Sequence, residues 1–137
     1  MIVADTSGLV AYFNDRDPAH QAVAAVVSEQ SHAIVVSPFV LAELDYLITR
    51  EMGHKAARIV LDELVGGAYE LLPLDLQDLR LIASTLDRYP GRGLGLTDAS
   101  LVVLAERVGA TAILTLDQRD FAGLQRADGV HLTILPH

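Results

Sequence analysis

The sequence predicts an α/β fold, a three-layer α/β/α sandwich in which helices cover both faces of a central, mainly parallel sheet. Short apolar runs, which we interpret as buried strands, alternate with segments of helical spacing along the whole chain. This alternation is typical of a parallel sheet that is covered on both faces. The 137 residues, 51% of them hydrophobic, are enough for one core and too few for two. We therefore expect a single domain over residues 1–137.

Apolar runs, caps and glycines delimit the expected elements. The expected strands are residues 1–4, 33–36, 69–72, 112–116 and 131–135. Asp17-Pro18 and Ser37-Pro38 each place a capping residue before a proline that suits the first helical position, and Thr97 is the expected cap before Asp98. The expected helices are residues 6–14, 18–29, 38–52, 54–65, 76–86 and 98–108, and three glycines make 90–95 a loop.

Composition excludes several classes of protein. Without cysteine there are no disulfides, thiolate metal sites or cysteine nucleophiles. The net charge of −8, from 18 acidic and 10 basic residues, argues against unspecific coating of nucleic acid by a basic surface. It is compatible with a nuclease whose acids hold cations. No apolar run reaches transmembrane length, and Asp5 interrupts the first apolar stretch. We expect a cytoplasmic protein without a signal peptide or a membrane partner.

Four acidic residues lie at positions where a parallel sheet is expected to bind a ligand. They are Asp5 at the end of the first strand, Asp117 just after the fourth, Asp98 in the first turn of a helix and Glu43 in the second turn of another. Ligands of open parallel sheets bind beyond the carboxyl ends of the strands. The four carboxylates, although far apart in the sequence, are therefore predicted to converge on one rim.

In the predicted helices, two of these acids lie on the same face as apolar residues. Asp98 is in line with Leu101 and Val102, and Glu43 lies near the apolar stripe of its own helix. A carboxylate on a core face is costly unless a group of opposite charge pairs with it, and no Lys or His stands at a matching position. Mg²⁺ prefers oxygen ligands, and two such ions can activate water against a phosphodiester. The pattern predicts a divalent metal site that hydrolyses nucleic acid.

Each acid, taken singly, also has an ordinary explanation. Asp98 suits the dipole at a helix start, Asp5 suits a turn after a strand, and Asp117 suits a solvated loop. Glu43 can be an exposed helix charge. Three arginines flank the expected rim: Arg88, Arg92 and Arg119. They are candidates for holding RNA phosphates, and solubilising surface charge is an equally good explanation of them.

Several segments together resemble a known family. They are Val3-Ala4-Asp5-Thr6-Ser7, Ser37-Pro38 followed by Ala42-Glu43-Leu44, Leu96-Thr97-Asp98-Ala99-Ser100, and Leu114-Thr115-Leu116-Asp117 followed by Phe121. In order and spacing, over essentially the whole chain, they resemble PIN-domain ribonucleases and, more narrowly, the VapC-type toxins of toxin–antitoxin pairs. Each segment alone is a weak signal.

The resemblance implies a PIN-like fold and Mg²⁺- or Mn²⁺-dependent cleavage of RNA that leaves 5′-phosphate and 3′-hydroxyl ends. It also implies a homodimer and a cognate antitoxin that blocks the active site. Structured RNA, such as transfer RNA or ribosomal RNA loops, is the implied substrate. Asp5, Glu43, Asp98 and Asp117 match the metal-site acids of the family. The resemblance also makes Thr6, Ser7 and Thr115 candidates for orienting a metal-bound water, and Asp120 a candidate fifth acid.

Three alternatives remain open at this point. A phosphatase of the haloacid dehalogenase type needs a second Asp two residues after Asp5, where the chain has Ser7, and a catalytic Lys, whereas the sole lysine is Lys55. A receiver-like Mg²⁺-binding module needs an early acidic pair and a late Lys. A PIN domain that processes RNA without being a toxin, or that only assembles, would share the fold.

Overall fold

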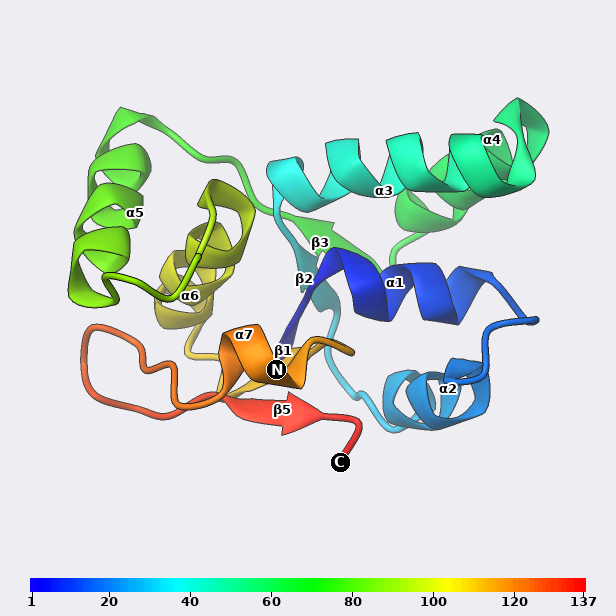
Figure 1. Ribbon diagram of the computed structural model, residues 1–137. Helices are drawn as coiled ribbons and strands as arrows, with labels where there is room; N and C mark the ends of the chain where they lie inside the picture. Colours follow the sequence, from blue (N-terminus) through cyan, green and yellow to red (C-terminus); the bar gives the residue numbers. More distant parts are fainter.

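The computed structural model describes residues 1–137. Twelve elements follow one another along the chain (Figure 1). They are β1 (Ile2–Ala4), α1 (Thr6–Phe13), α2 (His20–Ser28), β2 (Ile34–Val36), α3 (Pro38–Met52), α4 (His54–Leu64), β3 (Tyr69–Leu71), α5 (Leu76–Arg88), α6 (Leu96–Val108), β4 (Ala112–Leu114), α7 (Gln118–Phe121) and β5 (Thr133–Leu135). None of the helices combines the length and apolar character that crossing a membrane requires.

The five strands form one sheet in the order β3-β2-β1-β4-β5. Every neighbouring pair is parallel, and Val3 of β1 lies opposite Val35 on one side and Ile113 on the other. In Figure 1 the helices α5 and α6 lie on one side of the strands, and α1 to α4 lie on the other. The predicted α/β/α sandwich is confirmed, and its sheet is wholly parallel.

Burial of the strands follows their place in the sheet. Every residue of β1, β2 and β4 is buried, because these strands are central and covered on both faces. The edge strands β3 and β5 are only partly buried. The chain passes from β1 to the β2 side and later returns to β4 on the other side. The gap between β1 and β4 is thus a topological switch point, where ligands of such sheets bind.

Helix α6 is buried on two sides. Seven consecutive residues, from Ala99 to Ala105, are buried. Some of them join the main core, whereas Ala99 and Val103 pack with Ile82 of α5 in a small second cluster. A helix enclosed in this way has a fixed position, and so does Asp98 in its first turn.

Two predicted helix starts were wrong and one helix was not predicted, while the strands predicted at 112–116 and 131–135 are shorter, Ala112–Leu114 and Thr133–Leu135. Helix α2 begins at His20, and the Asp17 side chain accepts a hydrogen bond from Ala19 N at 2.8 Å in the turn before it. Helix α6 begins at Leu96 with Gly95 as its cap, so Thr97 is already helical. The four-residue helix α7 was not expected, because so short an element shows no periodicity.

Gly8 allows α1 to pack closely on β4. A Cβ atom at Gly8 would lie 2.6 Å from the carbonyl oxygen of Leu114. We expect Gly8→Ala to lower the free energy of unfolding by about 1–3 kcal/mol, because the backbone must move to relieve the contact. Urea denaturation measures this. Gly66→Ala is the matched control, since Gly66 is exposed and its nearest neighbour would be 3.2 Å away. Equal stability of the two variants would refute this explanation.

Candidate active site

Asp5 is held at the switch point by two hydroxyl groups. Its Oδ2 accepts hydrogen bonds from Ser7 Oγ at 2.9 Å and from Thr115 Oγ1 at 2.8 Å. These hydroxyls in turn accept from the backbone N–H groups of Leu116 and Asp117, each at 3.0 Å. The carboxylate is 7% exposed, and its Oδ1 accepts no hydrogen bond from the protein. The network fixes Asp5 in one orientation with one oxygen available.

The hydroxyl hydrogens of Ser7 and Thr115 are already committed. Each hydroxyl has a single hydrogen. Ser7 Oγ and Thr115 Oγ1 lie 3.1 Å apart, and both lie within hydrogen-bond distance of Asp5 Oδ2, so the two hydroxyls are engaged with Asp5 and with each other. Their structural contribution is to orient Asp5, and the water-orienting role stays a prediction. The Thr6 hydroxyl differs, because its oxygen is buried and has no hydrogen-bond partner.

Asp98 lies in the electrostatic field of three other acids. Its pKa is raised to about 6: burial is the largest cause, the charges of Asp5, Asp120 and Asp117 add to it, and the Gly95 N–H that donates to its Oδ2 at 3.3 Å opposes it. Nearby like charges disfavour the ionisation of a carboxyl group. The structure therefore brings Asp5, Asp98 and Asp117 into one electrostatic group, together with Asp120.

Asp117 and Asp120 belong to the start of α7. Asp117 is the N-cap of this helix, and its Oδ1 accepts from Asp120 N at 3.1 Å. The Asp117 carboxyl, first through a hydrogen bond and then through its charge, raises the pKa of Asp120, whereas the charges of Arg119 and Arg92 lower it. The charge of Asp117 thus acts on Asp120, and the charges of both act on Asp98; the role of Asp120 as a fifth acid stays a prediction.

Glu43 is not among the acids whose charges act on Asp98. It is exposed on α3, whereas Val40 and Leu44 are buried, so the expected orientation toward the core was wrong. The buried stripe of α3 runs through Val40, Leu44 and Ile48, and the residue before Leu44 is turned about 100° away from it. Glu43 makes no hydrogen bond or ion pair. Its place in the site stays a prediction.

One buried contact does bring the start of α3 near α6. Ser37 Oγ, in the cap of α3, lies 2.9 Å from Ser100 Oγ, two residues beyond Asp98. Glu43 is six residues farther along α3, which corresponds to a rise of about 9 Å. The Glu43 side chain therefore starts roughly two turns along α3 from the point where α3 contacts α6.

The donor set fits a divalent cation chemically. None of the salt bridges of the protein involves Asp5, Asp98, Asp117 or Asp120, so no basic side chain forms an ion pair with any of these acids. Oxygen-only donors of this kind suit Mg²⁺ or Mn²⁺. No three His, Cys, Asp or Glu side chains, however, stand together in an arrangement that could hold a metal ion. The four-acid metal site therefore stays a prediction.

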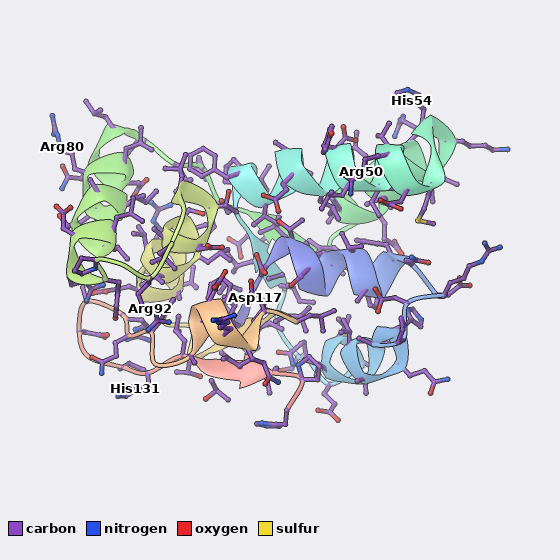
Figure 2. The ribbon with its side chains drawn as sticks, in the orientation of Figure 1. Arg50, His54, Arg80, Arg92, Asp117 and His131 are labelled. Atoms are coloured by element: carbon purple, nitrogen blue, oxygen red, sulfur yellow. The ribbon has the colours of Figure 1, made fainter.

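The three predicted arginines differ in their surroundings. Arg92 Nη2 donates to the carbonyl oxygens of Asp120 and Ala122, at 2.9 and 2.8 Å, and Figure 2 shows Arg92 beside α7, near Asp117. Arg88 donates to a backbone carbonyl at 3.4 Å. Arg119 is exposed on α7 and makes no hydrogen bond or ion pair. Phosphate binding stays a prediction for all three.

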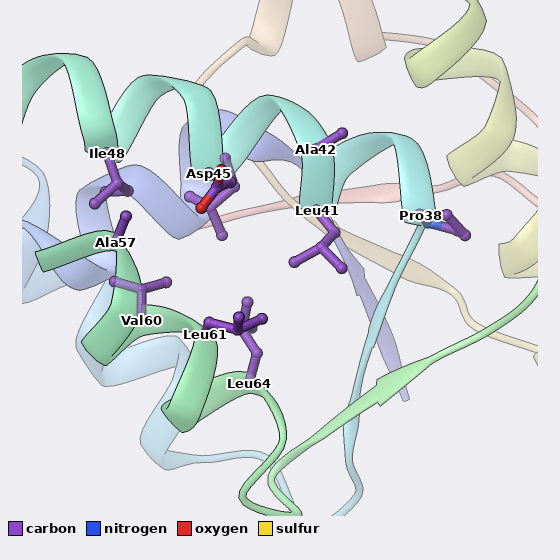
Figure 3. A pocket seen from close by; sticks show the side chains of 10 residues that line it. Pro38, Leu41, Ala42, Asp45, Ile48, Ala57, Val60, Leu61 and Leu64 are labelled. Carbon is purple, nitrogen blue, oxygen red and sulfur yellow. The ribbon is translucent and has the colours of Figure 1, made fainter. Parts of the chain in front are cut away.

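A separate apolar pocket lies between α3 and α4, on other elements than Asp5, Asp98, Asp117 and Asp120. It has a volume of about 340 Å³, and eight of its ten lining residues are hydrophobic. Figure 3 shows Leu41 and Ile48 of α3 facing Val60 and Leu61 of α4, with Asp45 as the one acid. Without further polar groups, this pocket lacks the chemistry of a hydrolytic site.

The raised pKa of Asp98 predicts how stability depends on pH. An acid whose folded pKa, about 6, lies above its unfolded value destabilises the fold when ionised. This cost is complete above pH 6 and disappears as the pH falls to 4. Asp98→Asn should therefore stabilise the metal-free protein at pH 7.5 but not at pH 4. Because Asp98 is only half-buried, screening reduces the gain to about 1 kcal/mol.

Urea denaturation in EDTA at the two pH values measures the effect. The matched control is Asp87→Asn, at an exposed position of α5, for which the change in stability should be the same at both pH values. An Asp98→Asn gain that does not depend on pH would show that burial and neighbouring acids do not act on Asp98 as inferred.

A family comparison and a sequence comparison with known proteins point to the same family. The model of the PIN domain family matches residues 2–127. Ribonuclease VapC26 of Mycobacterium tuberculosis is 41% identical over 135 residues, which cover 98% of this chain and 100% of that protein.

Solved structures agree with the fold. The crystal structure of Mycobacterium tuberculosis VapC20, a sarcin–ricin loop cleaving toxin, superposes with a TM-score of 0.81 at 21% identity, over 93% of this chain and 98% of that one. VapBC2 of Rickettsia felis, bound to a DNA fragment from its promoter, gives a TM-score of 0.70 at 18% identity over 98% of both chains.

Proposed function

The chain belongs to the PIN-domain family and resembles its VapC-type ribonucleases, and from this premise we propose that it is a metal-dependent endoribonuclease that acts as the toxin of a type II toxin–antitoxin pair. The proposed substrate is structured RNA, such as transfer RNA or ribosomal RNA, whose unstacked loop bases are accessible. The observation that carries the proposal is Asp98, half-buried and under the charges of three other acids, none of which forms an ion pair.

We propose that Asp5, Asp98 and Asp117, with Glu43 as a fourth ligand, would hold Mg²⁺ or Mn²⁺. A divalent cation, when bound, supplies the positive charge and Lewis acidity that phosphodiester hydrolysis requires. The protein supplies oriented oxygens: Asp5 Oδ1 and Asp98 Oδ1 accept no hydrogen bonds, while the other oxygen of each carboxylate is anchored. Asp120 adds negative charge beside Asp117.

The RNA backbone would contact basic as well as acidic side chains. Among Arg88, Arg92 and Arg119, Arg119 is the one with all its guanidinium N–H groups unengaged, so it is the best suited of the three to bind a phosphate in a bidentate manner. Arg92 retains Nε and Nη1 for the same purpose, and Arg88 is exposed nearby on α5. These positive charges would offset the repulsion between an acidic protein and RNA close to the acids.

The proposed partners are a cognate antitoxin and a second copy of the chain. Structural neighbours include a toxin–antitoxin complex from Klebsiella pneumoniae and VapBC complexes, which supports an antitoxin partner for this chain. The proposal also places the enzyme in the cytoplasm, where its RNA substrates are.

The other enzyme classes are less compatible with this site. Ser7, where a phosphatase of the haloacid dehalogenase type needs its second Asp, is engaged with Asp5. The sole lysine, Lys55, is exposed on α4, so neither that phosphatase nor a receiver-like module finds its required Lys. No observation favours a PIN nuclease that is not a toxin over the toxin.

The proposal is tested by mapping the 5′ ends of RNAs after incubation with the purified protein and Mg²⁺. We expect a small number of discrete cuts in loops, each with a 5′-phosphate. Cuts that persist unchanged with the Asp98→Asn protein would count against a site built on these acids. Absence of any metal-dependent cut in total RNA would refute the ribonuclease proposal.

The toxin assignment has a separate test. Expression in a bacterial host should arrest growth, and co-expression of a short antitoxin gene adjoining the gene of this protein should restore it. Expression of catalytically active protein that leaves growth unaffected would contradict the toxin assignment while leaving the ribonuclease proposal intact.

A further inference from the structure

Helix α7 is too short to be stable by itself and is held at both ends. It has four residues, whereas isolated helices need about 12–15 to become even marginally stable in water. Phe121 anchors it in the core with 0% exposure. At its start, the Asp117 carboxylate accepts from Asp120 N. At its end, the carbonyl oxygens of Asp120 and Ala122 accept from Arg92.

Arg92 reaches this helix end from the glycine-rich loop, about 30 residues earlier in the chain. Gly91 and Gly93, on either side of it, have φ values of +77° and +70°, a conformation that other residues rarely adopt. The guanidinium also lies 5.8 Å from the ring centre of Tyr89, whose hydroxyl accepts from Gln125 N at 3.0 Å. The loop thus places Arg92 at the end of α7. Tyr89 contacts both Arg92 and Gln125, which follows α7 in the chain.

We propose that Arg92 is a positioning residue, which caps the carboxyl end of α7 and thereby holds Asp117 and Asp120 beside Asp98. A cationic side chain that donates to the last carbonyls of a helix stabilises that end. Without it, the end of α7 frays, and the carboxylates at its start lose their fixed distance to Asp98 and Asp5. The consequence for catalysis rests on the proposed function, whereas the consequence for α7 does not.

The first test is hydrogen–deuterium exchange of the metal-free protein. Arg92→Gln should raise the exchange rate of amides in residues 118–124 by at least about tenfold, by local opening, and leave the central strands unchanged. Gly93→Ala should act in the same direction, because it strains the loop while retaining the guanidinium. Unchanged exchange in residues 118–124 in both variants would overturn the proposal.

The second test separates positioning from phosphate binding. A positioning role predicts that Arg92→Gln raises the Mg²⁺ concentration for half-maximal cleavage at least about fivefold, while KM for RNA changes less than twofold. Arg92→Lys should recover only part of the loss, because an ammonium lacks the planar fork of the guanidinium. A raised KM with an unchanged Mg²⁺ requirement, and full recovery by lysine, would show that Arg92 binds phosphate instead.

Two matched variants serve as controls. Arg126 also donates to a backbone carbonyl, that of Ala110 at 3.1 Å, but away from the acids, so Arg126→Gln should lower the melting temperature without altering the Mg²⁺ requirement. Arg80→Gln, on the exposed face of α5, should alter neither. If wild-type protein cleaves no RNA with any metal, the proposed function fails, and the exchange experiment still decides whether Arg92 holds α7.

Discussion

Asn substitution of Asp98 or of Asp5 is expected to lower the rate of RNA cleavage by roughly 10²–10³-fold, with little loss of stability. The expected loss corresponds to the several kcal/mol that a correctly held divalent cation contributes to the transition state. Both substitutions keep the size of the side chain and remove one negative charge from the acid group. Single-turnover cleavage of a mapped RNA site measures the effect.

The fold should tolerate both changes for different reasons. In Asp5→Asn, the amide oxygen can still accept from Ser7 and Thr115, which are the two hydrogen bonds that hold the wild-type side chain. In Asp98→Asn, the removed charge is one that burial and neighbouring acids disfavour. Circular dichroism and urea denaturation should therefore show folded proteins. Cleavage at wild-type rate by either variant would exclude a site built on these acids.

Two further variants refine this experiment. Asp87→Asn makes the same chemical change at an exposed position of α5 and should leave cleavage unchanged. Glu43→Gln decides whether the exposed acid of α3 takes part. A loss of more than about tenfold would place Glu43 among the ligands, and an unchanged rate would limit the site to the acids that follow β1 and β4 and the one at the start of α6.

Removal of divalent metal should abolish cleavage and lower thermal stability together. With EDTA we expect no measurable cleavage, and excess Mg²⁺ or Mn²⁺ should restore it. Because the cation binds the folded state alone, it should stabilise that state according to its concentration and affinity, by about 2.7 kcal/mol at one hundred times Kd. Differential scanning calorimetry at pH 7.5, with increasing Mg²⁺, measures this increase.

The stabilisation should depend on the acids. In the Asp5→Asn/Asp98→Asn double variant, the melting temperature should no longer respond to Mg²⁺, whereas the Asp87→Asn protein should respond like wild type. Cleavage that continues at full rate in EDTA would contradict metal dependence. A melting temperature that rises equally with Mg²⁺ in the double variant would locate the cation elsewhere on this acidic protein.

Most of the fold could be predicted because its signals are local. The runs at Ile2–Ala4 and Ile34–Val36 are apolar over their whole length, and this already requires a position covered on both faces. The cap of α3 is similarly local, since Ser37 Oγ accepts from Phe39 N and Pro38 follows at the first helical position. The acids at strand ends followed from the same reasoning.

The predictions that failed concern features that depend on which elements pack against each other. The phase of Glu43 on α3 was wrong because the face that a helix buries is chosen by its neighbours, here α1 and α4, and apolar residues on α3 allowed more than one choice. Helix α7 was missed because its stability comes from Phe121 and from contacts at both ends. Asp117 followed by Asp120 at the third helical position was its one local signal.

By itself, the sequence determined the order and type of nearly all elements, the parallel sheet, and the acids at the carboxyl ends of the strands. Only the tertiary structure decided which side chains far apart in the sequence contact one another. Pairing of β1 with β4 brings Thr115 to Asp5 across 110 positions, and the loop before α6 brings Arg92 to α7. The physical reason is that periodicity and caps act over a few residues, whereas strand order, register and close packing such as that at Gly8 are properties of the whole chain.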